Sequence, residues 1–444
     1  MKKSFLVLLF LSIGLFAEEV DEKALFFDTN IITLAPTLIT NPTQEKSLTL
    51  SGEFRSQLNY AFTKDFLNGQ TQSNANPFSY GIDGDFFFNI RPQSGYRIYG
   101  DLWLFASATG MPVEHRFFDP LTQTPLFAIE TNTLLLKNKE LFLDMNIANT
   151  VYLRMGKQVL KWGTTSFWNP IDLLNRERKT FSDPNSTREG IWGLKIHIPW
   201  GSSLNWYSFV DMTECKQIEN SAVASRLEWV MGNTEIGISG WWKKSFVSVY
   251  GGDVSTRLMG FDIKAEGSLS YGDNRPLLKE EILSFGTVSL TNVTPLPLTN
   301  RWVFRFALTL SRSFDFLDVK DRITTMGEIF YNSTGKENPP LFDNTTKVSQ
   351  GLLYGAYVPN EYNKWYAFGT LLIKRFLFPD GSLLSSLLWN IDDGSALLLF
   401  QLSYTPDSAL SASISATTSV GASEKEYTYD NLPLKLTSTV TLRF

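Results

Sequence analysis

The chain has 444 residues, with 40 Lys and Arg against 45 Asp and Glu, for a net charge of −5. This balance disfavours a nucleic-acid-binding protein, which needs a basic surface. A single cysteine, Cys215, excludes an intramolecular disulfide and a cysteine-based zinc cluster. Beyond residue 17 no run approaches the ~20 apolar residues of a membrane-spanning helix, which argues against a helical membrane protein.

The first residues have the pattern of a secretory signal peptide. Met1, Lys2 and Lys3 form a basic start, residues 5–16 form an apolar run, and Ala17 is a plausible cleavage edge. We therefore predict a signal peptide over residues 1–17. Residues 18–45 are expected to be a periplasmic or lumenal segment, and residues 46–444 a single domain.

From residue 48 onward, strand-like segments alternate with turns rich in Gly, Asn, Asp and Pro. Residues 92–95 and Gly232-Asn233 each separate two runs with strand character, as expected for hairpins. Pro379-Asp380-Gly381 and Asp392-Asp393-Gly394 punctuate the C-terminal third in the same way. We found no composition break that would mark a second globular domain.

Several strand-like segments place apolar and charged side chains on opposite faces. In residues 301–312, Trp302, Phe304 and the apolar positions that follow alternate with Arg301 and Arg305. Residues 193–198, 223–230 and 261–268 repeat the pattern. A soluble sandwich would have to expose the apolar face or bury the charged face. A membrane barrel turns the apolar face to lipid and the charged face to its lumen. The predicted lumen-facing residues are Arg226, Glu228, Asp262, Lys264, Glu266, Arg301 and Arg305.

The last residues, L-K-L-T-S-T-V-T-L-R-F, alternate in the same way and stop on an aromatic residue. This ending resembles the C-terminal insertion signal of bacterial outer-membrane β-barrels, carried here by Leu436, Val440, Leu442 and Phe444. The resemblance implies that the mature protein resides in the outer membrane as a multi-pass barrel. It also implies two partners, namely outer-membrane lipid and the barrel-insertion machinery.

We therefore predict an all-β fold, a transmembrane antiparallel β-barrel. Barrel strands of ~10 residues with their loops give about 16 strands, within a range of about 14–18. At this size side chains cannot fill the interior, so the lumen must hold water, an inward loop or an N-terminal plug. The 34 Phe, 16 Tyr and 12 Trp fit this fold, because a barrel carries aromatic residues on its lipid face and in interfacial girdles.

Residues 151–190 depart from the strand rhythm. A strand that carries Arg154 breaks at Lys161-Trp162-Gly163, and Trp168-Asn169-Pro170 cannot continue a ladder because proline lacks the N–H donor. The string G-x-Q-V-x-x-W-G…N-P-x-D resembles a motif of porin-like outer-membrane families, in which the segment after Trp-Gly folds inward.

Three interpretations of residues 161–190 stay open. The first is a pore constriction, which five cations and one carboxylate would line: Arg154, Lys161, Asp172, Arg176, Arg178 and Lys179. Such a constriction would favour small polar or anionic solutes. The second is an ordinary extracellular loop with solvated charges, and the third is a surface that binds a partner.

The function predicted from the sequence is a porin-like channel for passive uptake of small polar, including anionic, solutes. One alternative is a carrier of hydrophobic substrates, similar to long-chain fatty-acid channels, with residues 24–40 as its plug. A second is a surface adhesin or structural barrel. The two histidines, His115 and His197, lie in no catalytic motif, so we expect no enzyme, no cofactor and no metal site. A homo-oligomer stays open, and no nucleic-acid partner is expected.

Overall fold

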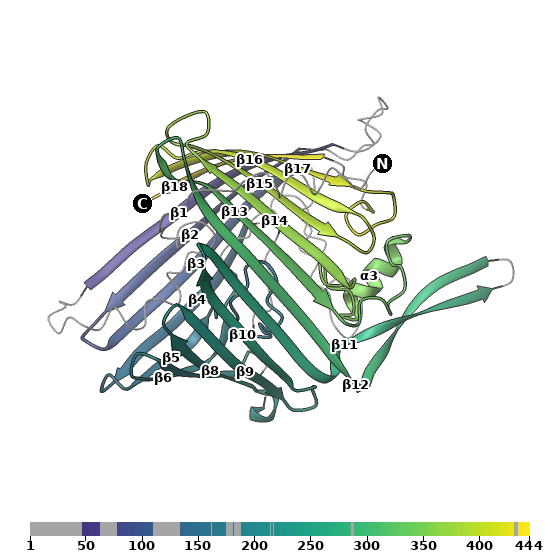
Figure 1. Ribbon diagram of the computed structural model, residues 1–444, viewed down its shortest axis with the longest axis horizontal. Helices are drawn as coiled ribbons and strands as arrows, with labels where there is room; N and C mark the ends of the chain where they lie inside the picture. Colours follow the sequence, from purple (N-terminus) through teal and green to yellow (C-terminus); the bar gives the residue numbers. More distant parts are fainter. Residues whose placement is uncertain are drawn as a thin grey trace.

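The computed structural model describes residues 47–62, 78–109, 134–160, 162–174, 181, 188–213, 215, 217–285, 288–429 and 434–444. The predicted signal peptide and the predicted N-terminal segment lie outside these residues. The described chain forms one closed antiparallel sheet of 18 strands (Figure 1). In this part of the chain no helix is long and apolar enough to cross a membrane.

The strands follow one another around the barrel in chain order. The first nine are β1 (Ser47–Phe62), β2 (Phe78–Arg91), β3 (Tyr96–Thr109), β4 (Leu134–Ile147), β5 (Val151–Gln158), β6 (Ile191–Trp200), β7 (Leu204–Asp211), β8 (Ala222–Met231) and β9 (Thr234–Lys243). The second nine are β10 (Val249–Leu258), β11 (Phe261–Phe285), β12 (Val288–Phe316), β13 (Val319–Asn332), β14 (Trp365–Lys374), β15 (Gly381–Asn390), β16 (Ala396–Tyr404), β17 (Leu410–Val420) and β18 (Leu434–Arg443). Among the described connections lie two short helices, η3 (Ile218–Asn220) and α3 (Thr345–Leu353).

The barrel closes where β18 pairs with β1. Glu53 lies opposite Arg443 and Phe62 opposite Leu434, and β1 pairs with β2 on its other side. The backbone of Phe444 completes the seam, since its N–H and C=O exchange two 3.0 Å hydrogen bonds with Gly52. Within the described barrel wall, closure leaves no unpaired sheet edge, which a lipid bilayer could not satisfy.

The observed 18 strands fall at the top of the expected range and exceed the central estimate. The estimate assumed more residues per connection than many hairpins use. Only Gly232-Asn233 separate β8 from β9, and only Leu317-Asp318 separate β12 from β13. Tight turns of this kind leave more of the chain for strands.

Alternation along each strand gives the barrel an apolar outside and a polar inside. On β12 the outward side chains of Trp302 and Phe304 are 62% and 41% exposed, whereas the inward Val303 and Thr309 are buried. The exposed apolar side chains recur on strands all around the barrel. An apolar band of this extent is compatible with lipid and not with water.

The two ends of the barrel differ. One end carries the short turns and the chain's C-terminus, and the other carries the longer connections. In outer-membrane barrels short turns are periplasmic and longer loops extracellular, which orients this molecule. The β11–β12 hairpin extends beyond the extracellular end, and α3 packs near its base (Figure 1).

Candidate functional site

An inward loop, described over residues 159–160 and 162–174, occupies the lumen. It leaves β5 after Gln158 and turns at Gly163, whose φ of +98° is a conformation that glycine adopts without steric cost. Most side chains of the loop are buried, although it is a connection between two strands. The first contact with the wall is made by the N–H of Val159, which donates to Glu140 on β4 at 2.6 Å.

Glu266 on β11 accepts several hydrogen bonds from the middle of the loop. Its carboxylate accepts the N–H groups of Thr164 at 2.8 Å, Thr165 at 3.2 Å and Ile171 at 3.2 Å. The side-chain amide of Asn169 adds a longer bond of 3.4 Å. One wall carboxylate thus satisfies backbone donors that a loop cannot pair internally.

Glu328 on β13 binds the tip of the loop in the same manner. It accepts the N–H groups of Ser166 at 2.9 Å and Trp168 at 2.7 Å, and that of Phe167 at 3.0 Å. Thr309 on β12 donates its hydroxyl to the same carboxylate at 2.7 Å. Each carboxyl group accepts several N–H groups of the loop at once, so Glu266 and Glu328 hold the loop in one place.

Apolar side chains dock the loop on two regions of the wall. Leu160, Trp162 and Ile171 pack with a cluster that includes Phe209 on β7 and Ala224 on β8. At the tip, Phe167 stacks on Phe368 with ring centroids 4.6 Å apart, and Trp168 stacks on Phe330 at 5.4 Å. The loop therefore connects the wall around β7 and β8 with the wall around β13 and β14.

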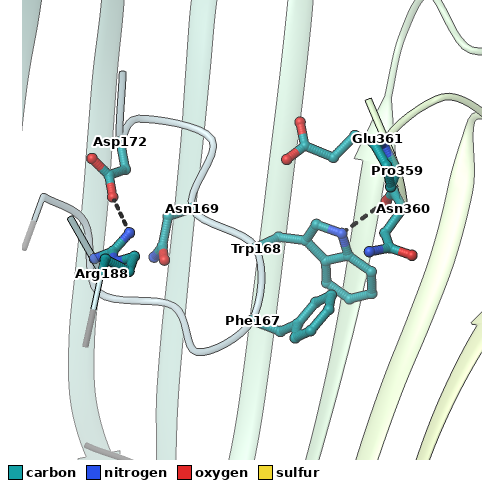
Figure 2. A pocket seen from close by; sticks show the side chains of 8 residues that line it. All are labelled: Phe167, Trp168, Asn169, Asp172, Arg188, Pro359, Asn360 and Glu361. Atoms are coloured by element: carbon teal, nitrogen blue, oxygen red, sulfur yellow. Dashed lines mark hydrogen bonds and ion pairs between the residues drawn. The ribbon is translucent and has the colours of Figure 1, made fainter. Parts of the chain in front are cut away.

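A pocket lies between the inward loop and the segment after α3 (Figure 2). It holds about 350 Å³ of space, part of it open to solvent. Arg188 donates to Asp172 at 3.1 Å on one side, and the indole N–H of Trp168 donates to the Asn360 carbonyl at 2.9 Å on the other. The remaining lining residues are Phe167, Asn169, Pro359 and Glu361. The lining is mixed, with an ion pair, two amides and aromatic edges.

The structure describes two of the six predicted constriction residues. Arg154 lies on β5, where it forms a bidentate pair with Asp144 at 2.6 and 3.0 Å and covers the ring of Phe142. Asp172 lies in the inward loop and is buried. The other four, Lys161, Arg176, Arg178 and Lys179, lie outside the described residues.

Around Arg154 the inner wall carries further cations. Arg97 on β3 lies 3.7 Å from Asp144, and Lys195 on β6 lies opposite Arg154 in the register. Lys195 also covers the ring of Tyr207 at 5.3 Å. The carboxylates of Glu140 and Glu228 belong to the same group of charges, so this wall presents three cations among three carboxylates.

Most of the predicted lumen-facing residues carry ion pairs or loop contacts. Arg226 binds Asp253 on β10, with one contact of 2.9 Å, and Arg305 binds Asp273 on β11. Asp262 accepts from Arg257 at 2.6 Å.

Glu266 holds the inward loop, while Glu228 lies 3.5 Å from Arg226. Lys264 lies opposite Ser255 and Thr309 in the register. Arg301 lies at the rim, where it binds Glu337 and stays 39% exposed.

The residues of the predicted insertion signal lie on the outer surface near the seam. The exposed fractions of Leu436, Val440, Leu442 and Phe444 range from 37% to 63%. The Phe444 ring stacks against Phe54 on β1 with centroids 5.8 Å apart.

Reasoning from the sequence missed Glu140 and Glu328 and gave Glu266 no role beyond facing the lumen. A signal for Glu328 is present in the sequence. In β13 it shares the inner face with Met326 and Phe330, so it is an acid between two large apolar residues. A buried carboxylate in such a place must find donors. Among the described residues no group of acids, histidines or cysteines could hold a metal ion.

No protein-family model matches the chain, and no curated protein sequence is similar to it. Solved structures are similar in fold. OccAB1 of Acinetobacter baumannii has a TM-score of 0.52 at 10% identity, covering 89% of this chain and 96% of its own. The outer-membrane protein OprD of Pseudomonas aeruginosa has a TM-score of 0.48 at 8% identity, covering 90% and 94%. OccK2 of the same organism, solved with glucuronate, also has a TM-score of 0.48, at 9% identity over 90% and 98%.

Proposed function

We propose that this protein is an outer-membrane channel that lets small polar solutes diffuse into the periplasm. The observation that carries the proposal is the inward loop, held across the lumen by Glu266 and Glu328. A loop fixed in this way narrows a wide barrel without closing it by a folded domain. The likeness in fold to OccAB1 supports a barrel of this architecture.

The inner wall supports polar rather than hydrophobic solutes. Charged side chains on the inner face form ion pairs with neighbours on adjacent strands, such as Arg226 with Asp253 and Arg257 with Asp262. A hydrophobic molecule would have to displace water from these pairs and bring no hydrogen bonds in exchange. A carrier of hydrophobic substrates is therefore the weaker reading.

We further propose a preference for anions. On the described wall the cations Arg97, Arg154 and Lys195 lie near the carboxylates of Asp144, Glu140 and Glu228, so their charges balance. The preference for anions therefore rests on the predicted constriction residues Arg176, Arg178 and Lys179. Charges along a pore set the local ion concentration and hence the selectivity.

Liposome swelling tests the uptake of polar solutes. Proteoliposomes are diluted into isotonic solutions of arabinose, glucose or a disaccharide, with protein-free liposomes as the control. We expect swelling that slows as the sugar grows larger. Swelling no faster than in protein-free liposomes would contradict the channel.

The reversal potential in a planar bilayer under a salt gradient tests the preference for anions. We expect the wild type to favour anions and Arg176→Glu with Arg178→Glu to shift the potential toward cations. An unchanged potential in this double variant would place both side chains outside the conducting path.

A further inference from the structure

Three segments meet at Asn360, at the extracellular end of the lumen. Its N–H donates to Glu426 at 2.9 Å, its side-chain oxygen accepts from the Tyr427 hydroxyl at 2.9 Å, and its carbonyl accepts from the Trp168 indole at 2.9 Å. Its φ of +66° lies in the left-handed region, which asparagine tolerates better than most residues. This Asn360 junction thus ties the outer segment 421–429 to the inward loop.

Glu426 is the centre of the outer half of the junction. Besides the Asn360 N–H, its carboxylate accepts the hydroxyl of Tyr366 at 2.8 Å, the amide of Asn390 at 2.7 Å and the hydroxyl of Tyr357 at 3.3 Å. The side chain is buried, with 3% of the residue exposed. Four donors from three different parts of the chain therefore converge on one carboxylate.

The ionisable groups around Glu426 are neutral or negative. Tyr357 and Tyr362 face it from the segment after α3, Tyr366 from β14 and Tyr427 from its own segment. From the turn between β15 and β16, Asp393 accepts the Glu426 N–H at 3.0 Å. Within the described chain no cation forms an ion pair with Glu426. An ionised carboxylate is costly in such a place, because burial removes water and no positive charge replaces it.

We propose that Glu426 is a positioning residue that makes the Asn360 junction a pH-sensitive latch at the channel mouth. When Glu426 is protonated, the segment 421–429 is held closed against the inward loop. When Glu426 ionises, the segment 421–429 moves out toward water, and the Trp168 indole loses its hydrogen bond to the Asn360 carbonyl. This latch rests on the proposed channel function, because its output is the width of the pore.

The protonation behaviour of Glu426 supports this direction. Burial raises the pKa of Glu426 from 4.5 to about 7, the Asp393 carboxylate adds to the rise, and the hydrogen-bond donors lower it only in part. A group whose pKa is higher in the closed state stabilises that state below its ordinary pKa. The stabilisation is lost as the pH rises through 7. The ratio of closed to open forms therefore falls on the order of 100-fold across this window.

Single-channel conductance between pH 5 and pH 8 tests the latch. We expect the wild type to pass from a low to a higher conductance as the pH rises through this range. Glu426→Gln removes the ionisable group from this position, so the conductance of the variant should not change with pH. Glu424→Gln removes the same charge from an exposed position of the same segment and should behave as the wild type. A Glu426→Gln channel with the wild-type pH profile would overturn the proposal.

A spin label provides a readout that does not depend on conduction. Ser423 is exposed on the segment 421–429, and Cys215→Ser makes a cysteine there unique. The label should become more mobile as the pH rises from 5 to 8, and Glu426→Gln should abolish the change. A label mobility that does not change with pH would contradict the latch. A mobile label in a barrel that does not conduct would contradict the proposed function instead.

Discussion

At the scale of single residues, the account rests on carboxylates that face backbone N–H groups. A loop in a lumen carries donors that no neighbouring strand can pair, and an unpaired buried N–H costs about 1–3 kcal/mol. Glu266 and Glu328 together accept six such groups, from Thr164 to Trp168 and from Ile171. These bonds explain how a polar backbone can lie against a barrel wall.

Glu328→Gln should loosen the tip of the inward loop. The substitution replaces one acceptor oxygen by an NH₂ group, which then faces the N–H groups of Ser166, Phe167 and Trp168. We expect a loss of about 1–3 kcal/mol in the free energy that docks the loop, and more current noise in single-channel recordings. Glu337→Gln, at an exposed rim pair, is the matched control. Identical traces for the two variants would mean that Glu328 does not hold the loop.

Gly163→Ala should displace the loop where it enters the lumen. A Cβ at this position would lie 2.4 Å from the Glu266 carboxylate, and the φ of +98° is strained for alanine. Gly201→Ala has a similar backbone strain at a φ of +65°, but its Cβ would meet open space. Comparing the two by thermal unfolding and conductance isolates the clash. We expect only Gly163→Ala to raise the conductance, and an equal rise in both would refute the contact with Glu266.

At the scale of elements, the strands could be predicted from the sequence because their alternation is local. Residues 261–268 and 301–312 each place charged residues on one face, and a period of two is readable without knowing the neighbours. The hairpins at Gly232-Asn233 and Asp392-Asp393-Gly394 were readable for the same reason, since turn chemistry is local. All-β architecture and a closed barrel followed from these patterns.

The inward loop could be predicted only in part. Gly163 and Pro170 indicate that the strand ends. No local pattern, however, predicts the direction that a loop takes after a strand. Its destination depends on Glu266 and Glu328, which lie about a hundred or more residues away in the chain. Contacts of that sequence separation arise from barrel closure. The same reason hid the Asn360 junction, which joins three segments that are distant in the chain.

At the scale of the whole molecule, the seam between β1 and β18 determines whether the barrel exists. Phe444 contributes two backbone hydrogen bonds to Gly52 and a stacked contact with Phe54. Deleting Phe444 should remove these contacts together with the predicted insertion signal. We expect a severalfold lower yield of folded protein in the membrane fraction, measured by the mobility shift between unheated and boiled samples. Phe378→Ala, an exposed aromatic far from the seam in the turn before β15, should assemble normally.

The molecule as a whole combines a wide closed barrel with a narrow lumen. Its outer face is apolar and suited to contact with lipid, and its inner face is polar. The inward loop crosses the space between β7–β8 and β13–β14. The wall strands pair with each other independently of this loop, so the barrel should persist when the loop is shortened. The central claim is that this loop restricts an aqueous pore.

Single-channel conductance in a planar bilayer tests that claim most directly, with the wild type compared with a variant in which residues 163–170 are replaced by a short Gly-Ser linker. We predict stepwise openings in both proteins and a severalfold larger conductance in the variant, because water and ions would fill the space the loop leaves. A wild type that inserts as a folded barrel without openings, or two proteins with the same conductance, would contradict the account.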